Sequence, residues 1–492
     1  MANLSPSTKV SKKQGVVDLF DALPDDLIAH IISFLPFKEA VRSSCLGRRW
    51  RYRWLELRRI DLDESHFTQS EMRQLLELDG LQPFDYGLRL SGRRHFLDFV
   101  SRFVARYAEP QVESFRLAFS NPKEHADKVR AWVGAMVALK VENLELDLTD
   151  PDEEEPFEGN YGYLDLPEEV YGELAGRWLR TMTLTGCDVQ PERLGALHAL
   201  RVLSLSRIAI ARDGVEKLTA SCPLLEELYL DHLTDTEEIT ITSASRRLRV
   251  LDINECDPIP YGVRLIQVPA LELFRYMGFT GNFVVDTVNT LEEAELYFIW
   301  DDSDDASELL RDLLEDLNMV TSLTVCSFLL QVVPFADNPW QLSSSKNKVK
   351  HLTLDGVTLL KDEIQGIGLL MRSYPQLTSL SIILSDTKLR PSGNGQPSDE
   401  EADVEGSWEE QSGVPIPCLV DHLQYVTIEN FTGHQSQLKF MKFILKSAKA
   451  LLAVHIYVDP TPTTGTLECC LEEARKMLGY EKASEVVMIT IS

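Results

Sequence analysis

A short run of the form apolar-x-x-apolar-x-apolar recurs thirteen times along the sequence. Most of the runs start 20 to 29 residues apart, and the two longest gaps carry the polar stretches 150–158 and 389–417. Apolar positions four and six of each run alternate with polar ones, which places them on one side of a short strand. The first residues of the runs are Val112, Val141, Leu179, Leu200, Leu225, Leu248, Leu271, Leu291, Val320, Val349, Leu377, Leu423 and Leu451.

The spacing is typical of leucine-rich repeats. One unit cannot bury its apolar side alone, but stacked units share a continuous core. We therefore expect an α/β fold in which the strands form a curved parallel sheet. Intervening residues such as Ser204 and Tyr229 then point outward from the concave side. Asparagine is mostly missing after the strands, so the repeats are irregular, and an ordinary α/β domain is the alternative.

The segment from Leu23 to Trp54 follows a helical pattern instead. Pro24 and two aspartates suit the start of a helix, and Pro36 ends it. The helix between them has a wide apolar stripe. A second helix is expected near Lys38, and a third segment carries Trp50 and Trp54. So small a unit cannot bury this apolar surface internally, which points to a partner or to the rest of the chain.

These residues resemble an F-box. The matching motifs are Leu23-Pro24-Asp25-Asp26, Phe34-Leu35-Pro36, Ala40-Val41-Arg42-Ser43-Ser44 and Arg48-Arg49-Trp50. The resemblance implies a three-helix unit that docks on the Skp-type adaptor of a Skp–cullin–F-box ubiquitin ligase, and through it on a cullin. The residues carried over as adaptor contacts are Leu23, Pro24, Leu27, Ile28, Ile31, Leu35 and Val41. The alternative is that these side chains form an internal core.

Two further regions resemble plant F-box/LRR-repeat proteins. Residues 95–148 are similar to the link between F-box and repeats, and Cys418–Ser492 is similar to the FBD domain. The turn 479–483 departs from the usual FBD pattern. The resemblance implies a disordered N-terminus (1–17), an F-box (18–57), a helical linker (58–110), a leucine-rich-repeat solenoid (111–386), a disordered acidic insertion (387–416) and an FBD domain (417–492).

Charge divides the chain at about the same place. The formal net charge is -28, but residues 1–60 carry 11 basic and 6 acidic side chains. An acidic surface repels phosphate and attracts cations, so we expect a basic protein substrate and no nucleic-acid or membrane partner. The arginine-rich run Arg48–Arg59 has aromatics interleaved, as in RNA-binding surfaces, but it also suits an amphipathic helix with its aromatics packed inward.

No catalytic motif and no metal-ligand spacing is found in the sequence. The acidic stretches 152–155, 301–305 and 399–405 lack the spacing of a calcium loop and are interpreted as solvated loops. We expect neither catalytic nor metal-binding residues and no cofactor. No signal peptide or long apolar run is visible, so an intracellular protein, nuclear or cytoplasmic, is expected.

The expected function is that of a non-catalytic substrate adaptor, whose substrate-binding residues stay unknown. The resemblance also leaves open a hormone-type small-molecule receptor of the same architecture. A repeat scaffold without a role in ubiquitination is the other alternative.

Overall fold

The computed structural model divides into two compact units, Met1–Pro151 and Asp152–Ser492. It describes residues 23–67, 86–120, 122–149, 164–256, 259, 262–286, 288–299, 305–335, 342, 347–385, 416–462 and 466–492. The segments expected to be disordered, 1–17 and most of 387–416, lie outside the described residues.

The first unit begins with the predicted helical segment. Helices α1 (Asp25–Ser33) and α2 (Phe37–Ser43) form as expected, each preceded by a proline at its N-cap. The third segment is a series of turns that ends in the short 3-10 helix η1 (Arg53–Glu56). Trp54 of this helix stacks on Phe99 and Phe103, with ring centroids 5.9 and 5.7 Å apart. Packing of this aromatic side chain thus supports a segment too short to be stable as an isolated helix.

Three parallel strands and the helices between them form the rest of the core of this unit. They are β1 (Arg59–Asp63), β2 (Ser114–Ala118) and β3 (Asn143–Asp147), with Ile60 opposite Phe115 and Phe115 opposite Leu144. Between them lie α4 (Tyr86–Arg106), η2 (Pro122–His125) and α5 (Ala126–Val137). The segment expected to be a helical linker therefore contains a strand, β1, as well as α4. Its alternation of buried Ile60 and Leu62 with polar neighbours suits the edge of a sheet.

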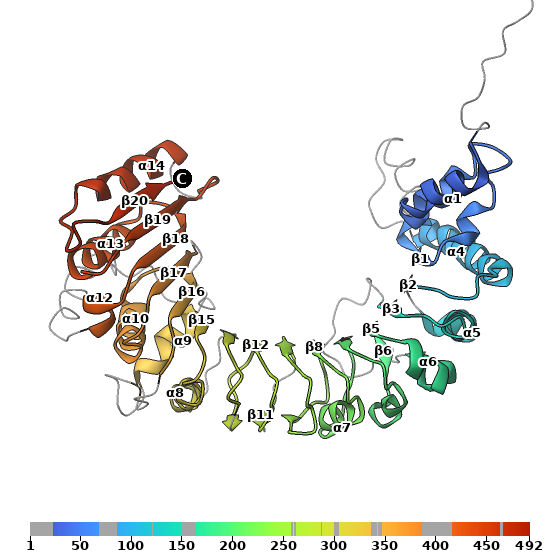
Figure 1. Ribbon diagram of the computed structural model, residues 1–492, viewed down its shortest axis with the longest axis horizontal. Helices are drawn as coiled ribbons and strands as arrows, with labels where there is room; N and C mark the ends of the chain where they lie inside the picture. The colour runs from blue at the N-terminus through green and yellow to red at the C-terminus, as the bar shows by residue number, and fades with distance from the viewer. Residues whose placement is uncertain are drawn as a thin grey trace, which may run out of the picture. The chain divides into compact units, whose positions relative to one another are not determined.

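A long parallel sheet forms the second unit, with most helices on one of its faces (Figure 1). Its strand order is β5-β7-β8-β10-β12-β14-β15-β16-β17-β18-β19-β20. The strands are β5 (Thr181–Thr185), β7 (Val202–Ser206), β8 (Glu227–Asp231), β10 (Val250–Asn254), β12 (Leu273–Gly278), β14 (Glu293–Phe298), β15 (Ser322–Cys326), β16 (His351–Val357), β17 (Ser379–Leu384), β18 (Tyr425–Phe431), β19 (Ala453–Val458) and β20 (Met488–Ile491).

Burial along these strands follows the repeat pattern. The two apolar positions of β7, Leu203 and Leu205, are fully buried, and the corresponding residues of the other repeats are similarly enclosed. Parallel pairing in register aligns them, so that Leu205 lies opposite Leu230. Beyond several strand ends the backbone turns at a positive φ, including 64° at Gly186 and 49° at His232. The expected α/β solenoid with an irregular repeat is thereby confirmed.

The segments that connect the strands vary in structure. They include helices α6 (Glu173–Trp178), α7 (Gly214–Ser221), α8 (Ala306–Asp316), α9 (Ser327–Val332), α10 (Lys361–Ser373), α12 (Pro417–Asp421), α13 (Gln435–Ser447) and α14 (Leu467–Lys476), and the 3-10 helices η3 (Glu168–Tyr171), η4 (Pro191–Ala196), η5 (Val333–Phe335) and η7 (Met477–Gly479). In the middle, strands β9 (Ile239–Ile241), β11 (Val263–Ile266) and β13 (Phe283–Asp286) form a second parallel sheet. Strands β4 (Leu164–Asp165) and β6 (Cys187–Asp188) also pair.

The FBD-like segment extends the same sheet. Strand β18 pairs with β17, the last strand of the predicted solenoid segment 111–386, β19 pairs with β18, and β20 pairs with β19. Helices α13 and α14 connect these strands in the manner of the preceding repeats. The region resembling FBD is therefore continuous with the repeat core.

The contact between α9 and α10 requires glycine at position 366. A Cβ atom added there would lie 2.1 Å from the carbonyl oxygen of Leu330, which is backbone and cannot rotate away. We expect Gly366→Ala to destabilise the protein by about 2 kcal/mol because the helices must separate. Thermal unfolding checks this, with Gly479→Ala as the control, since a Cβ at Gly479 meets nothing within 4 Å. An unchanged midpoint for Gly366→Ala would refute the close approach.

Candidate protein-docking surfaces

One side of helix α1 presents apolar side chains to solvent. Leu27, Ile31 and Phe34 have exposed fractions of 48%, 41% and 74%. Their spacing of four and three residues places them on one line along the helix. On the neighbouring side, which faces the core, Ile28 and Ile32 are fully buried. The helix is thus apolar on both sides, and only one of them is used for the internal core.

The structure divides the seven predicted contacts. Pro24, Leu27 and Ile31 are exposed, Leu23, Leu35 and Val41 are partly buried, and Ile28 is fully buried. Ile28 therefore contributes to the core of the unit and is not accessible to a partner in this conformation. Phe34 was not among the predicted residues, although its spacing from Leu27 and Ile31 is a visible signal.

Arginines downstream of α2 hold the beginning of α1. Asp25 accepts hydrogen bonds from Arg49, and Arg53 approaches its other oxygen at 2.9 Å. The hydrogen bond from Arg49, aided by the charges of both guanidinium groups, lowers the pKa of Asp25. These two arginines therefore have a structural role, and Trp54 packs inward. Both the ion pairs of these arginines and the inward packing of Trp54 agree with an amphipathic segment, the second interpretation of the arginine-rich run.

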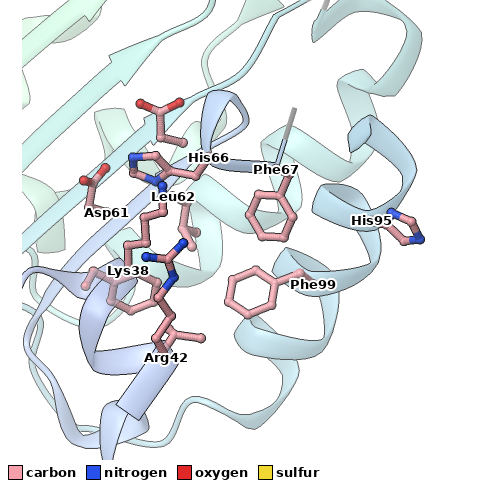
Figure 2. A pocket seen from close by; sticks show the side chains of 11 residues that line it. Lys38, Arg42, Asp61, Leu62, His66, Phe67, His95 and Phe99 are labelled. Atoms are coloured by element: carbon pink, nitrogen blue, oxygen red, sulfur yellow. The ribbon is translucent and has the colours of Figure 1, made fainter. Parts of the chain in front are cut away.

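A cavity of about 410 Å³ lies beside α2 (Figure 2). Phe67 and Phe99 contribute apolar lining, and Lys38 and Arg42 of α2 line it as well. Asp61 and Asp63 also line it, but both already accept hydrogen bonds from Arg116. Residue 67 directly precedes the gap 68–85 in the described chain, so we assign the cavity no ligand.

The second unit has an open sheet face whose charged strand residues are nearly all acidic. Outward positions in β8, β10, β14, β16 and β18 hold Glu227, Asp231, Asp252, Glu293, Glu295, Asp355 and Glu429. Arg275 is the single Lys or Arg at the outward positions of the long sheet from β5 to β20 as described. A face with this excess of carboxylates attracts cationic groups.

A groove of about 360 Å³ crosses this face between β8 and β14. Arg275 lies on its floor and is held by Asp252 at 2.8 Å and Glu295 at 2.7 Å. The negative charges of Asp252 and Glu295 together exceed the single positive charge of Arg275. Tyr229, Met277 and Tyr297 contribute aromatic and thioether surface. The groove thus combines flat apolar side chains with net negative charge.

Asp231 adds an ionised carboxylate at the edge of the groove. Its side chain accepts hydrogen bonds from Ser206 at 2.6 Å, Asn254 at 2.5 Å and His232 at 3.0 Å. Burial by itself would raise the pKa of Asp231, but these hydrogen bonds lower it overall. The group consequently remains negatively charged at neutral pH.

No group of three or more His, Cys, Asp or Glu side chains is placed to hold a metal ion within the described ranges. The acidic stretches 152–155 and 399–405 lie outside those ranges, as do residues 301–304. No helix in the described part of the chain is both long and apolar enough to cross a membrane.

Three family models match the sequence in this order. The F-box domain model matches residues 20–61, a model described as "At1g61320/AtMIF1, LRR domain" matches residues 106–335, and the FBD model matches residues 410–456. The chain therefore combines an F-box with leucine-rich repeats and an FBD. The fold and the exposed side of α1 indicate the same class of protein.

Relatives with similarity over most of the chain come from Arabidopsis thaliana. "Putative F-box/LRR-repeat protein At5g54820" is 28% identical over 482 residues, covering 95% of this chain and 94% of the relative. F-box protein At3g62230 is 26% identical, covering 90% and 92%, and F-box/FBD/LRR-repeat protein At4g26340 is 24% identical, covering 88% and 91%. The chain thus carries the F-box, LRR and FBD domains that its motifs indicated, and it is similar over most of its length to F-box/LRR-repeat proteins.

Proposed function

We propose that the protein is the substrate-recognition subunit of a Skp–cullin–F-box ubiquitin ligase. The observation that carries this proposal is the line formed by Leu27, Ile31 and Phe34, exposed on a helix whose other side is already buried. Exposed apolar side chains grouped on one surface indicate a protein-binding site. The F-box match covers this helix, and an F-box implies a Skp-type adaptor as partner.

In this proposal the protein acts by holding two proteins close together. The F-box binds the adaptor, and through it the cullin, while the repeat and FBD region binds a protein substrate. The transfer of ubiquitin takes place on other subunits. Holding a substrate lysine near the loaded conjugating enzyme raises its effective concentration, and no catalytic group of this chain is needed.

Isothermal titration of the full chain with a purified Skp-type adaptor tests the proposal. We expect a one-to-one complex with a negative heat-capacity change, because apolar area of α1 becomes buried. The absence of binding by a chain shown to be folded by circular dichroism would contradict the adaptor role.

The open face of the second unit supports a basic substrate segment. Acidic groups there outnumber the one arginine, and Arg275 is already held by two carboxylates. Tyr229 and Tyr297 line the same groove, and aromatic faces bind lysine and arginine side chains favourably. We therefore propose that the substrate presents a lysine- or arginine-rich segment to this face.

A lysine-rich synthetic peptide provides a measurable probe of this face. Glu227→Gln, Asp231→Asn and Glu293→Gln together are expected to weaken its binding about tenfold, because three negative charges are removed. The matched control replaces three exposed glutamates away from this face by glutamine. They are Glu173 on α6, Glu216 on α7 and Glu468 on α14. Fluorescence anisotropy measures both. Equal weakening by the two sets would show that only total charge matters.

A further inference from the structure

Helix α13 carries a lysine row that departs from the charge of the rest of the protein. The chain has 77 acidic and 49 basic residues, yet between Glu429 and Asp459 it has four lysines and no Asp or Glu. Lys439, Lys442 and Lys446 lie on α13, and Lys449 follows directly after it. This segment therefore forms a basic region within an acidic unit.

The three helical lysines share one side of the helix. Their spacing of three and four residues aligns them along the surface. Leu438, Met441 and Ile444 are almost fully buried on the side that packs on the sheet, whereas Lys442 and Lys446 are exposed and Lys439 is partly so. We call Lys439, Lys442 and Lys446 the lysine row. It faces solvent because the core side of α13 is fixed by its apolar residues.

The lysine row has no carboxylate partner among the described residues. By contrast, Lys217 pairs with Asp213 and Lys476 pairs with Glu473 on neighbouring turns of their helices. Like charges three and four residues apart destabilise a helix, and α13 contains no acidic residue to offset them. Local helix stability therefore does not explain the row.

The elements packed beside α13 do not neutralise it. Helix α12 ends at Asp421. The backbone N–H of Ala483 donates to the carbonyl oxygen of Leu445 at 2.8 Å. This hydrogen bond places the segment with Glu481 and Lys482 beside the end of α13. Neither acidic side chain makes an ion pair with the lysine row. The positive charge is consequently available to an outside partner.

We propose that the lysine row binds a short acidic segment of another protein. Lys439 and Lys446 are seven positions apart on the helix, a rise of about 10 Å, which three or four extended residues span. A long nucleic acid or a membrane would also meet exposed carboxylates of this acidic unit, such as that of Glu468 at the start of α14. A short Asp- or Glu-rich peptide avoids that repulsion. This surface is independent of adaptor docking by the F-box.

The test measures binding of a fluorescent octaglutamate peptide to the full chain at low salt. Lys439→Glu, Lys442→Glu and Lys446→Glu together are expected to weaken binding at least about tenfold, and added salt should weaken binding to the wild type. The control variant replaces exposed Lys123, Lys128 and Lys348 by glutamate, giving the same change of net charge. We expect its affinity to stay within about twofold of the wild type.

Several results would overturn the proposal. They are no peptide binding by the wild type, wild-type affinity in the lysine-row variant, and equal weakening in the control. Binding of a short DNA duplex or of phosphatidylserine vesicles to the same row, as tight as or tighter than the peptide, would also overturn it. The partner would then be a polyanion other than an acidic protein segment. Circular dichroism of each variant shows that the chain is still folded, and adaptor binding measured in parallel should remain unchanged.

Discussion

Replacing Leu27 and Ile31 together by aspartate is expected to weaken adaptor binding by at least about 100-fold. Each new carboxylate would have to be buried at the interface without a partner, and central apolar contacts contribute about 2 kcal/mol or more each. Because both side chains are 41% or more exposed, the folded chain itself should change little in stability. Titration with the adaptor measures the effect.

The matched control for this variant is Leu174→Asp. Leu174 lies on α6 and is 40% exposed, so aspartate there adds one of the two charges of the double variant at a similarly exposed apolar position. We expect normal adaptor affinity for this control. Ile28→Asp is unsuitable as a binding variant because Ile28 is fully buried, and its replacement would unfold the F-box. Normal adaptor affinity of the Leu27/Ile31 double variant would show that this side of α1 is not the docking surface.

Glu363→Ala is expected to destabilise the protein by about 3 kcal/mol. Glu363 is 1% exposed, and its carboxylate accepts the backbone N–H groups of Thr358 at 3.0 Å and Leu359 at 2.7 Å. The hydroxyl groups of Ser327 and Thr358 also bond to it. Alanine leaves these buried donors without acceptors. The backbone at Leu359, whose φ is 58°, would then lose the group that holds this turn.

Glu363→Gln separates hydrogen bonding from charge. Glutamine keeps one acceptor oxygen, so we expect a loss of about 1 kcal/mol, smaller than for alanine. Urea unfolding at neutral pH measures both variants. Equal losses for the two would contradict the assigned role of the backbone N–H groups.

The pH dependence provides a second test at the same residue. Burial raises the pKa of Glu363 above its ordinary value of 4.5, despite the opposing hydrogen bonds. The folded state therefore holds this proton more tightly, and that contribution to stability is lost as the pH rises through the folded-state pKa. The wild type should lose stability relative to the glutamine variant as the pH rises above about 4.5. A constant difference would refute the raised pKa.

The repeat core was the part of the fold most predictable from the sequence. Buried positions such as Leu203 and Leu205 recur with a fixed spacing, and parallel stacking follows because one unit cannot bury them alone. The outer segments were not predictable, since both helices and the β9-β11-β13 sheet can cover the same side of the core. Strand β1 was missed because it belongs to no recognisable repeat and acquires its partner, β2, only after a long intervening helix.

The docking surface was predictable in part. Sequence periodicity identified α1 as apolar on a wide stripe, but it did not show which residues of the stripe face the core. The packing of Ile28 and Ile32 decides this, and it leaves Leu27, Ile31 and Phe34 outside. Charge pairing is equally a tertiary property. The sequence shows the arginines and lysines, whereas only the fold shows that Arg49 binds Asp25 and that the lysine row has no carboxylate partner among the residues the structure describes.

Hydrogen–deuterium exchange with and without a Skp-type adaptor is the sharpest test of docking through α1. We predict slower exchange of the amides of α1 and of residues 34 and 35 when the adaptor is bound, because the partner covers the side that carries Leu27, Ile31 and Phe34. The open face of the repeat sheet should exchange as before. Adaptor binding with unchanged exchange in α1 and protection of the repeat strands instead would contradict docking through this helix.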